Sequence, residues 1–496
     1  MSLFRMKSIE QSIADTDDPD TKLRKDLSAT DLVVFGVGVI IGAGIFVLTG
    51  TVAASNSGPA LALSFLIAGI ACALAGLCYA EFASTVPVAG SAYTFSYATL
   101  GELVAWIIGW DLILEFTIGS AALAVGFSGY LQSLLDGTAL EVPTSISSAS
   151  DGVVDLPAIV IALVVMAMLI RGTKFSSRVN QVVVAIKLAV VATVIVVGIV
   201  YVDPSNWVPF IPESQPVPEG EGGFSELPLI TSLFGIDPAV YGLAGVVSGA
   251  AIVFFAFIGF DIVATTAEEA KNPRRDVPIG ILGSLLIVTV LYAGVSLVVT
   301  GIQPYSEIDP EDAAPLATAF DYAGVEWMGD LISVGACIGL VVVVMILMLG
   351  QTRVGFAMGR DGLFPRWIAK VHPTYGTPYR ITAITGVVVA ALAGLVDLST
   401  LVSLVNIGTL FAFILVSVGV VVLRRRRPDL PRAFRTPFLP VVSTLAVIMC
   451  VYLMLNLTGE TWERFVIWMA LGLVVYFVYG RRHSRLQNQP EKQVEA

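Results

Sequence analysis

Long apolar runs separated by short polar segments occupy most of the 496-residue chain. A helix that crosses a bilayer needs about 20 apolar residues, so windows of roughly that length locate candidate transmembrane segments. The longest runs predict either tilted helices or helices that continue beyond the membrane. In total the pattern predicts an all-α membrane protein with twelve transmembrane helices, at residues 31–54, 60–83, 100–132, 154–171, 180–202, 243–270, 277–301, 327–352, 381–397, 399–423, 438–457 and 462–479.

The positions of the basic residues agree with this topology. The chain contains 28 Lys and Arg residues, and the twelve segments place 26 of them on one side of the membrane. Only Arg464 falls on the other side, while Lys187 falls inside a predicted span. Because cytoplasmic loops carry the excess of Lys and Arg, the pattern predicts an even number of spans with both termini in the cytoplasm.

The composition excludes a soluble globular protein. Hydrophobic residues make up 56% of the chain and charged residues only 14%, against about 25% in soluble domains. We therefore expect a multi-pass protein of the plasma membrane, surrounded by lipid, with one transmembrane domain at residues 30–480. A cytoplasmic arm at residues 1–29 lacks the apolar core of a signal peptide, and a cytoplasmic tail follows at residues 481–496.

The net charge of −11 comes from the loops opposite the basic side. Residues 133–153, 203–242 and 302–326 hold many Asp and Glu residues and no Lys or Arg. Such a surface either concentrates cations near a pore or is an ordinary solvated face. The basic clusters are short and adjoin the spans, so no nucleic-acid partner is expected.

The first ten spans form two halves of similar size. Residues 30–202 contain the first five and residues 243–423 the next five, and two extra helices follow at residues 438–479. Because five is odd, corresponding helices of the two halves enter the membrane from opposite sides. This arrangement predicts an inverted repeat, in which substrates bind near the membrane centre where corresponding helices are interrupted.

The span at residues 31–54 has the composition of an interrupted helix. Each glycine in the middle of a helix costs about 1 kcal/mol relative to alanine. We predict a break near Gly42 to Gly44, although small residues also permit close helix packing. The glycines are Gly36, Gly38, Gly42, Gly44 and Gly50.

A break at this point would expose backbone groups that suit an amino acid. Amides at the start of the second half-helix favour a carboxylate, and carbonyls at the end of the first favour an ammonium. The span at residues 243–270 has a corresponding weak point, where Gly259 precedes Asp261, an acid able to cap the half-helix that follows. The predicted binding groups are the amides of Ala43, Gly44 and Ile45, the carbonyls of Val39 and Ile40, and the backbone around Phe255, Ala256 and Ile258.

Lys187 is also unusual, because it is a charged residue inside a predicted span. It lies nine residues after Arg178, which is about 13 Å of helix rise into the membrane. A lysine near the bilayer centre costs about 3 kcal/mol and normally pairs or lines a pathway. We predict that its ammonium reaches the carbonyl end of the first half-helix, in place of a sodium ion, and that it carries a proton during transport. The alternative is that the side chain extends to the cytoplasmic surface.

Other polar residues give weaker indications of function. Glu115 is the deepest acid of its span and either belongs to a proton path or the pocket, or makes internal hydrogen bonds. The four cysteines and two histidines have no metal-ligand spacing, so neither a metal site nor a cofactor is expected. No nucleotide-binding loop or nucleophile motif occurs, which argues against an enzyme.

Four stretches of the chain resemble the amino-acid/polyamine/organocation transporter superfamily, and within it the prokaryotic relatives of the cationic amino-acid transporters. The similarity covers about residues 27–480, and the third stretch is its most specific part. The stretches read GVGVIIGAGIF, VNQVVVAIKLAVV, FFAFIGFDIVATTAEEAKNPRRDVPIGI and GQTRVGFAMGRDGLFP.

The resemblance implies a LeuT-type fold of two five-helix inverted repeats plus two further helices. It also implies a set of backbone-binding positions, with Lys187 at the position where sodium binds in other members. Relatives commonly have Thr or Ser where this chain has Ala43, so the resemblance supports backbone contacts there rather than a hydroxyl contact. The positions are Ile40, Gly42, Ala43, Gly44, Ile45, Phe255, Ala256 and Ile258.

The predicted function is secondary active amino-acid transport, with proton-coupled symport by alternating access as the leading hypothesis. An amino-acid exchanger that needs no protons is the near alternative, and a transporter-like sensor or channel is a more distant one. The sequence leaves the substrate side chain, the stoichiometry and the oligomeric state open.

Overall fold

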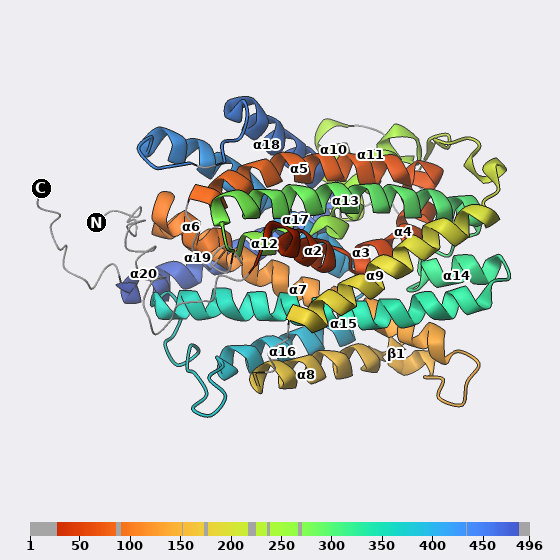
Figure 1. Cartoon of the computed structure of the whole chain (residues 1–496), viewed down its shortest axis with the longest axis horizontal. Coiled ribbons are helices and arrows are strands. Elements are labelled where there is room, and N and C mark those ends of the chain that lie inside the picture. The colour runs from red at the N-terminus through yellow and green to blue at the C-terminus, as the bar shows by residue number, and fades with distance from the viewer. Residues whose placement is uncertain are drawn as a thin grey trace, which may run out of the picture.

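The computed structural model describes residues 27–85, 91–150, 152–172, 177–216, 225–235, 239–265, 270–432 and 434–485. The described part is mostly helical, and most helices run along the long axis of the molecule (Figure 1). Most of the predicted arm and tail, at residues 1–26 and 486–496, lies outside the described residues.

Two interrupted helices lie inside this bundle. The first consists of α2 (Ala29–Ile40), α3 (Ala43–Phe46) and α4 (Leu48–Val52), and the second of α11 (Gly242–Val253) and α12 (Phe260–Thr265). Ser28 caps the start of α2, since its hydroxyl accepts the Asp31 amide while the Asp31 carboxylate accepts the Ser28 amide.

The remaining helices cover these two. They are α5 (Leu61–Thr85), α6 (Ser91–Thr99), α7 (Glu102–Leu135), α8 (Leu156–Ile170), α9 (Ser177–Gly198), α10 (Leu229–Phe234), α13 (Pro273–Ile302), α14 (Pro315–Tyr322), α15 (Glu326–Arg360), α16 (Tyr379–Leu395), α17 (Leu398–Arg426), α18 (Leu439–Leu455), α19 (Gly459–Val475) and α20 (Arg481–His483).

Eight helical runs in the described part of the chain are long and apolar enough to cross a membrane, and four shorter apolar helices accompany them. The eight include one run from Leu48 to Thr85. Within it the chain reverses direction near Gly58, whose φ is 56°, so that α5 runs back along the bundle beside α13 (Figure 1). The predicted spans 31–54 and 60–83 are therefore joined by a tight helical turn.

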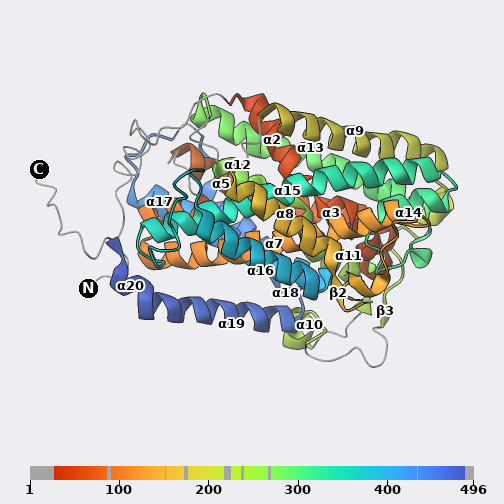
Figure 2. The same cartoon turned by 90° about the horizontal axis from the view of Figure 1, so that it is seen from below.

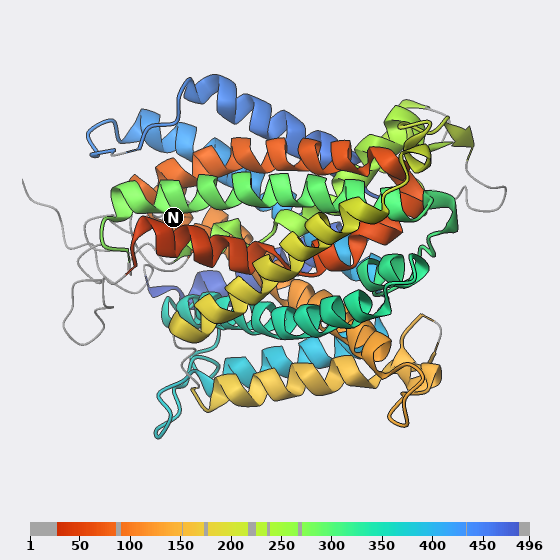
Figure 3. The same cartoon turned by 45° about the vertical axis from the view of Figure 1, so that its right-hand side comes forward.

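Helix α7 lies at the centre of the bundle. It packs against α15 and α17 along much of its length, and most of its residues are buried. Helix α9 crosses α2 obliquely and packs against it, as Figure 3 shows with α9 in yellow and α2 in red. Helix α19 runs along one edge of the molecule (Figure 2).

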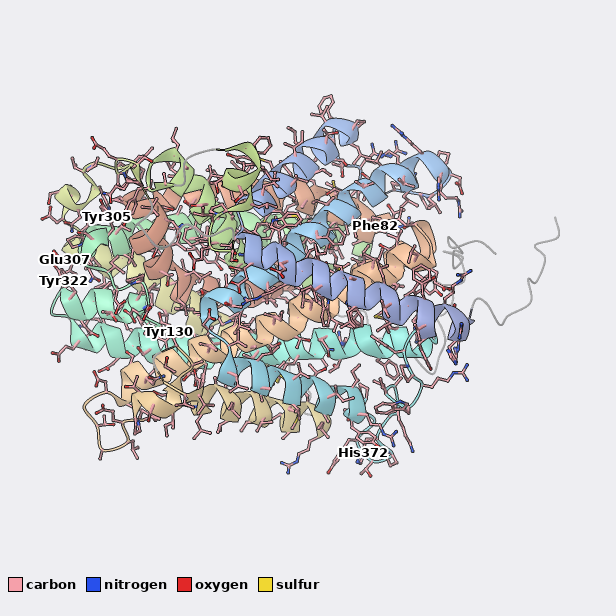
Figure 4. The ribbon with its side chains drawn as sticks, turned by 180° about the vertical axis from the view of Figure 1, so that it is seen from behind. Phe82, Tyr130, Tyr305, Glu307, Tyr322 and His372 are labelled. Carbon is pink, nitrogen blue, oxygen red and sulfur yellow. The ribbon has the colours of Figure 1, made fainter. Side chains whose placement is uncertain are left out.

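The two ends of the bundle differ in charge. At the end that we call the acidic end, two small antiparallel strand pairs form, β1 (Ser147–Ser148) with β2 (Val154–Asp155) and β3 (Gln215–Pro216) with β4 (Ala239–Val240). Figure 4 places Glu307 at this end and His372 at the opposite one. At that opposite end, the basic end, Arg424 and Arg432 pair with the buried Glu81.

Candidate functional site

The first helix is interrupted within one residue of the predicted position. Helix α2 ends at Ile40, Ile41 and Gly42 are extended, and α3 begins at Ala43. The first amides of a helix have no acceptor within it, so this break leaves donors near Gly44 available. Residues Ile40 to Ile45 are all buried.

The second helix is interrupted in a similar way. Helix α11 ends at Val253, and one 3-10 turn, Phe254–Phe257, follows it. Ile258 is extended, and Gly259 has a φ of 111°, a conformation that glycine adopts without strain. Helix α12 then begins at Phe260.

The two breaks touch each other. A Cβ atom placed on Gly44 would lie only 2.2 Å from the Cα atom of Ala256, so the backbones meet with no room for a side chain. Gly42 has more space, since its Cβ would lie 3.1 Å from a methyl group of Leu123 in α7. Phe255 and Ile258, the other predicted binding residues, are buried beside this contact.

Lys187 reaches the end of α2. Its Nζ donates to the Ile41 carbonyl at 2.8 Å and to the Gly38 carbonyl at 2.9 Å, and the residue is only 1% exposed. Its alkyl chain packs against Gly339 of α15, where an added Cβ would lie 2.5 Å from Cε. The side chain therefore points to the break rather than to the surface.

Tyr292 of α13 was not among the predicted site residues. Its hydroxyl oxygen lies 2.8 Å from the Ile40 carbonyl and 2.9 Å from the Ala256 carbonyl, so it bridges the two breaks. A hydroxyl has one proton, so it donates to one of these carbonyls at a time. A lone tyrosine in the apolar run 277–301 was the available signal.

Asn406 of α17 was also missed. Its Nδ2 donates to the Ala251 and Ile252 carbonyls, both at 2.9 Å, and so satisfies acceptors where α11 gives way to the 3-10 turn. The backbone carbonyls at the end of a helix need such partners in a buried setting. A buried asparagine inside the apolar run 399–423 was the corresponding signal.

Glu115 lies away from the two breaks. It precedes Leu123, the α7 residue beside Gly42, by eight residues, or about 12 Å along the helix towards the basic end. It is fully buried, and within the described part of the chain neither of its carboxylate oxygens has a hydrogen-bond partner.

A cavity of about 800 Å³ lies at the acidic end, beyond α4. Its walls include Leu48 and Thr51, a few residues along the chain from Gly44. The Ser128 hydroxyl and the Ala158 amide donate to the buried carboxylate of Asp155. The carboxylates that line the cavity are Asp136, Glu141, Asp155, Glu311, Asp312, Asp321 and Asp397.

Comparison with known proteins identifies relatives along the whole chain. Residues 27–478 match the amino acid permease family. The chain is 46% identical to the methylthioribose transporter of Bacillus subtilis and 47% identical to the branched-chain amino acid permease BcaP of the same organism; each alignment covers 98% of this chain and 99% of the relative.

A plant relative is more distant but equally complete. The chain is 32% identical to the vacuolar cationic amino acid transporter 4 of Arabidopsis thaliana, over 98% of this chain and 97% of the relative. These matches agree with the resemblance found in the sequence motifs. The chain belongs to the amino acid permease family, within the amino-acid/polyamine/organocation superfamily.

Proposed function

We propose that this protein is a secondary active amino-acid permease of the plasma membrane that takes up its substrate together with protons by alternating access. The observation that carries the proposal is the contact of the Lys187 ammonium with the Gly38 and Ile41 carbonyls at the end of α2. A membrane-buried cation held by two neutral carbonyls can leave or lose its proton when the break moves, which couples proton movement to substrate binding.

The architecture that we propose is the LeuT-type fold. Twelve spans would form two inverted repeats at residues 30–202 and 243–423, with extra helices at residues 438–479 and both termini in the cytoplasm. Support comes from the interruption of α2–α4 and of α11–α12, which are the corresponding helices of the two halves. In this arrangement the basic end faces the cytoplasm and the acidic end faces outwards.

The proposed binding site is the meeting point of the two breaks. The amides of Ala43, Gly44 and Ile45 would hold the substrate carboxylate, and carbonyls near Ile40 and Ala256 would hold its ammonium. Gly42, Phe255 and Ile258 would shape the pocket. The close approach of Gly44 to Ala256 supports this assignment, since the backbones of the two breaks are in contact there.

The first experiment identifies the substrate. The relatives are named for methylthioribose, branched-chain and cationic amino acids, so the panel should contain radiolabelled methylthioribose, L-leucine, L-arginine and L-alanine. Uptake into vesicles containing the purified protein, with an inward pH gradient and no internal substrate, is expected for at least one amino acid. Uptake of none of the amino acids would contradict the proposal.

The second experiment tests proton coupling through Lys187. In a Lys187→Met variant we expect uptake driven by a pH gradient to fall to the level of empty vesicles, because the basic group that the described residues place at the end of α2 is gone. Lys370→Met, the same change at an exposed loop position, should behave as the wild type. Normal proton-driven uptake by Lys187→Met would refute the role of Lys187.

An exchanger that needs no protons remains the second candidate. The wild type distinguishes the two mechanisms: strict dependence of uptake on internal amino acid, with no response to a pH gradient, would establish exchange instead of symport.

A further inference from the structure

A second group of buried polar side chains lies between the breaks and the basic end. It consists of Asp111 and Glu115 of α7, Asp261 of α12, Tyr79 of α5 and Asn406 of α17, and none of them is more than 3% exposed. We call these five residues the acidic chamber. The proposed transport mechanism assigns a proton to Lys187. This side chain contacts α2 rather than the acidic chamber.

Several side-chain oxygens of the acidic chamber lack hydrogen-bond partners among the described residues. They are both carboxylate oxygens of Asp111 and Glu115, one of Asp261, the Asn406 amide oxygen and the Tyr79 hydroxyl. Thr409 lies beside Glu115, but its hydroxyl donates to the Val405 carbonyl at 3.0 Å. Buried polar groups are normally satisfied, so this concentration of unpaired oxygens in one place requires an explanation.

The carboxyl groups also lack a compensating charge. Glu115 interacts electrostatically with Asp111 and Asp261, and Tyr79 interacts with all three acids. Among the described residues, Cys450 of α18 also interacts with Tyr79. Among the described residues, no Lys, Arg or His interacts with these three carboxyl groups.

A basic side chain of α17, the helix that carries Asn406, is already paired. Arg424 of α17 donates to Glu81 from its Nε at 3.0 Å. It therefore belongs to a separate ion-pair cluster at the basic end. Three ionised carboxylates buried in this setting without a cation would be strongly unfavourable.

Protons are the occupants that best fit the acidic chamber. Within the described residues, the carboxylates do not converge into a group able to hold a metal ion. A proton removes the charge of a carboxylate and converts one oxygen from an acceptor into a donor. Three protons would supply three donors to a set in which, among the described residues, the Tyr79 hydroxyl is the one unpaired donor.

The acidic chamber is built across a hinge. Asp111 and Glu115 lie on α7, a continuous 34-residue helix, whereas Asp261 lies on the six-residue α12 behind the extended Ile258 and the positive-φ Gly259. Backbone amides at Gly259 and Ile262 interact with Asp261 and fix it to the start of α12. A movement of α12 would therefore carry one carboxyl group away from the other two and change their access to water.

We propose that Asp111, Glu115 and Asp261 form a second proton-binding site, separate from Lys187, which fills when the chamber is closed and releases protons to the cytoplasm when α12 moves. This inference rests on the proposed function, since it assumes transport by alternating access. Each step is the gain or loss of a proton at a carboxylate oxygen, with water at one membrane face as the source and at the other as the acceptor. The interaction between neighbouring acids makes their proton binding a property of the group.

The test measures the number of protons moved per substrate. Vesicles with an entrapped pH-sensitive dye report proton entry, and the amino acid with the highest wild-type uptake reports substrate entry. In the variant D111N/E115Q/D261N we expect this ratio to fall by about twofold or more, because the protons of the acidic chamber are lost and only the one at Lys187 remains. A ratio does not depend on how much protein is folded or on the turnover rate.

Two further variants keep the result interpretable. Glu115→Gln alone should lower the ratio in the same direction if the triple variant does not fold. Glu102→Gln is the matched control, since Glu102 is a buried acid of the same helix that accepts hydrogen bonds from Tyr97, Tyr476 and Ser484, and its ratio should equal that of the wild type.

The outcomes separate the two proposals. A proton ratio in D111N/E115Q/D261N and Glu115→Gln equal to that of the wild type would mean that the acids stay protonated throughout, and would overturn the second site. Absence of proton-driven uptake in the wild type would instead overturn the proposed function.

Discussion

At the scale of single residues, the site depends on glycines, which have no side chain, as much as on the side chains that make its contacts. Gly44 allows the α3 backbone to reach Ala256, and Gly339 allows the Lys187 alkyl chain to lie against α15. Close backbone approach is one of the few roles that only glycine fills. The backbones of the two breaks are therefore in direct contact at Gly44.

A Gly44→Ala substitution should therefore disable the permease. The new Cβ would lie 2.2 Å from backbone of the second break, and overpacking of this kind costs about 1–3 kcal/mol. Since 1.4 kcal/mol is a factor of ten, we expect substrate uptake by vesicles to fall by about tenfold or more. The measurement is initial uptake normalised to the amount of folded protein.

Gly350→Ala serves as its control. This glycine lies in α15, and the nearest atom to its added Cβ, in the ring of Phe116, is at an ordinary 3.4 Å. Its uptake should stay near the wild-type rate. Equal losses of uptake in the two variants would mean that uptake depends on helix glycines in general and not on the contact between the breaks.

At the scale of helices, the sequence showed which residues are unusual in a membrane helix but not which of them lie together in the folded bundle. The glycines around Gly42 and the charge of Lys187 are conspicuous in apolar runs because each carries a cost in a membrane helix. Tyr292 and Asn406 are marked in the sequence only as single polar residues inside apolar runs, and this does not say what they contact. Their role depends on which carbonyl each faces across the bundle, and helix rotation and register decide that.

The acidic chamber is another case in which the sequence does not show which residues lie together. Glu115 and Asp261 were each recognised as unusual, but they lie on helices more than 100 residues apart, and their proximity follows from the packing of α12 and α7 around α17. The break positions, by contrast, were predictable to within about one residue because they are local properties of the chain.

The contact of α5 with α17 depends on one buried acid. Glu81 accepts the Thr436 amide at 2.8 Å and pairs with Arg424 and Arg432, whose side chains come from the end of α17 and the segment that follows. A Glu81→Gln change removes the negative charge and leaves Arg432, which is nearly inaccessible, without a counter-ion. Breaking a buried pair in this way costs about 3–5 kcal/mol.

We expect Glu81→Gln to lower the thermal unfolding midpoint of the detergent-solubilised protein clearly. Glu460→Gln is its control, because it breaks the exposed pair with Arg464 on one face of α19, and exposed pairs contribute about 0–1 kcal/mol. Comparable shifts in the two variants would show that the Glu81 cluster does not hold α5 to α17.

At the scale of the whole molecule, charge separates the two ends. The cavity at the acidic end is lined by carboxylates, while the basic end carries Arg424 to Arg427 and the loop after α15. If the acidic end faces outwards, a cationic or zwitterionic substrate meets an attractive potential before it reaches the breaks, and added salt should weaken that attraction. The orientation of the bundle is thus part of the transport hypothesis.

Single cysteines can establish this orientation in intact cells. In a background lacking Cys72, Cys78, Cys337 and Cys450, Glu141→Cys places a thiol in an exposed loop of the acidic end, and Tyr375→Cys places one at the basic end. We expect a membrane-impermeant maleimide to label Glu141→Cys directly and Tyr375→Cys only after the cells are opened, because Lys- and Arg-rich loops stay in the cytoplasm. The reverse pattern would place the carboxylate-lined cavity on the cytoplasmic side. The proton exit proposed for the acidic chamber would then lead out of the cell, and the transport direction would have to be reconsidered with it.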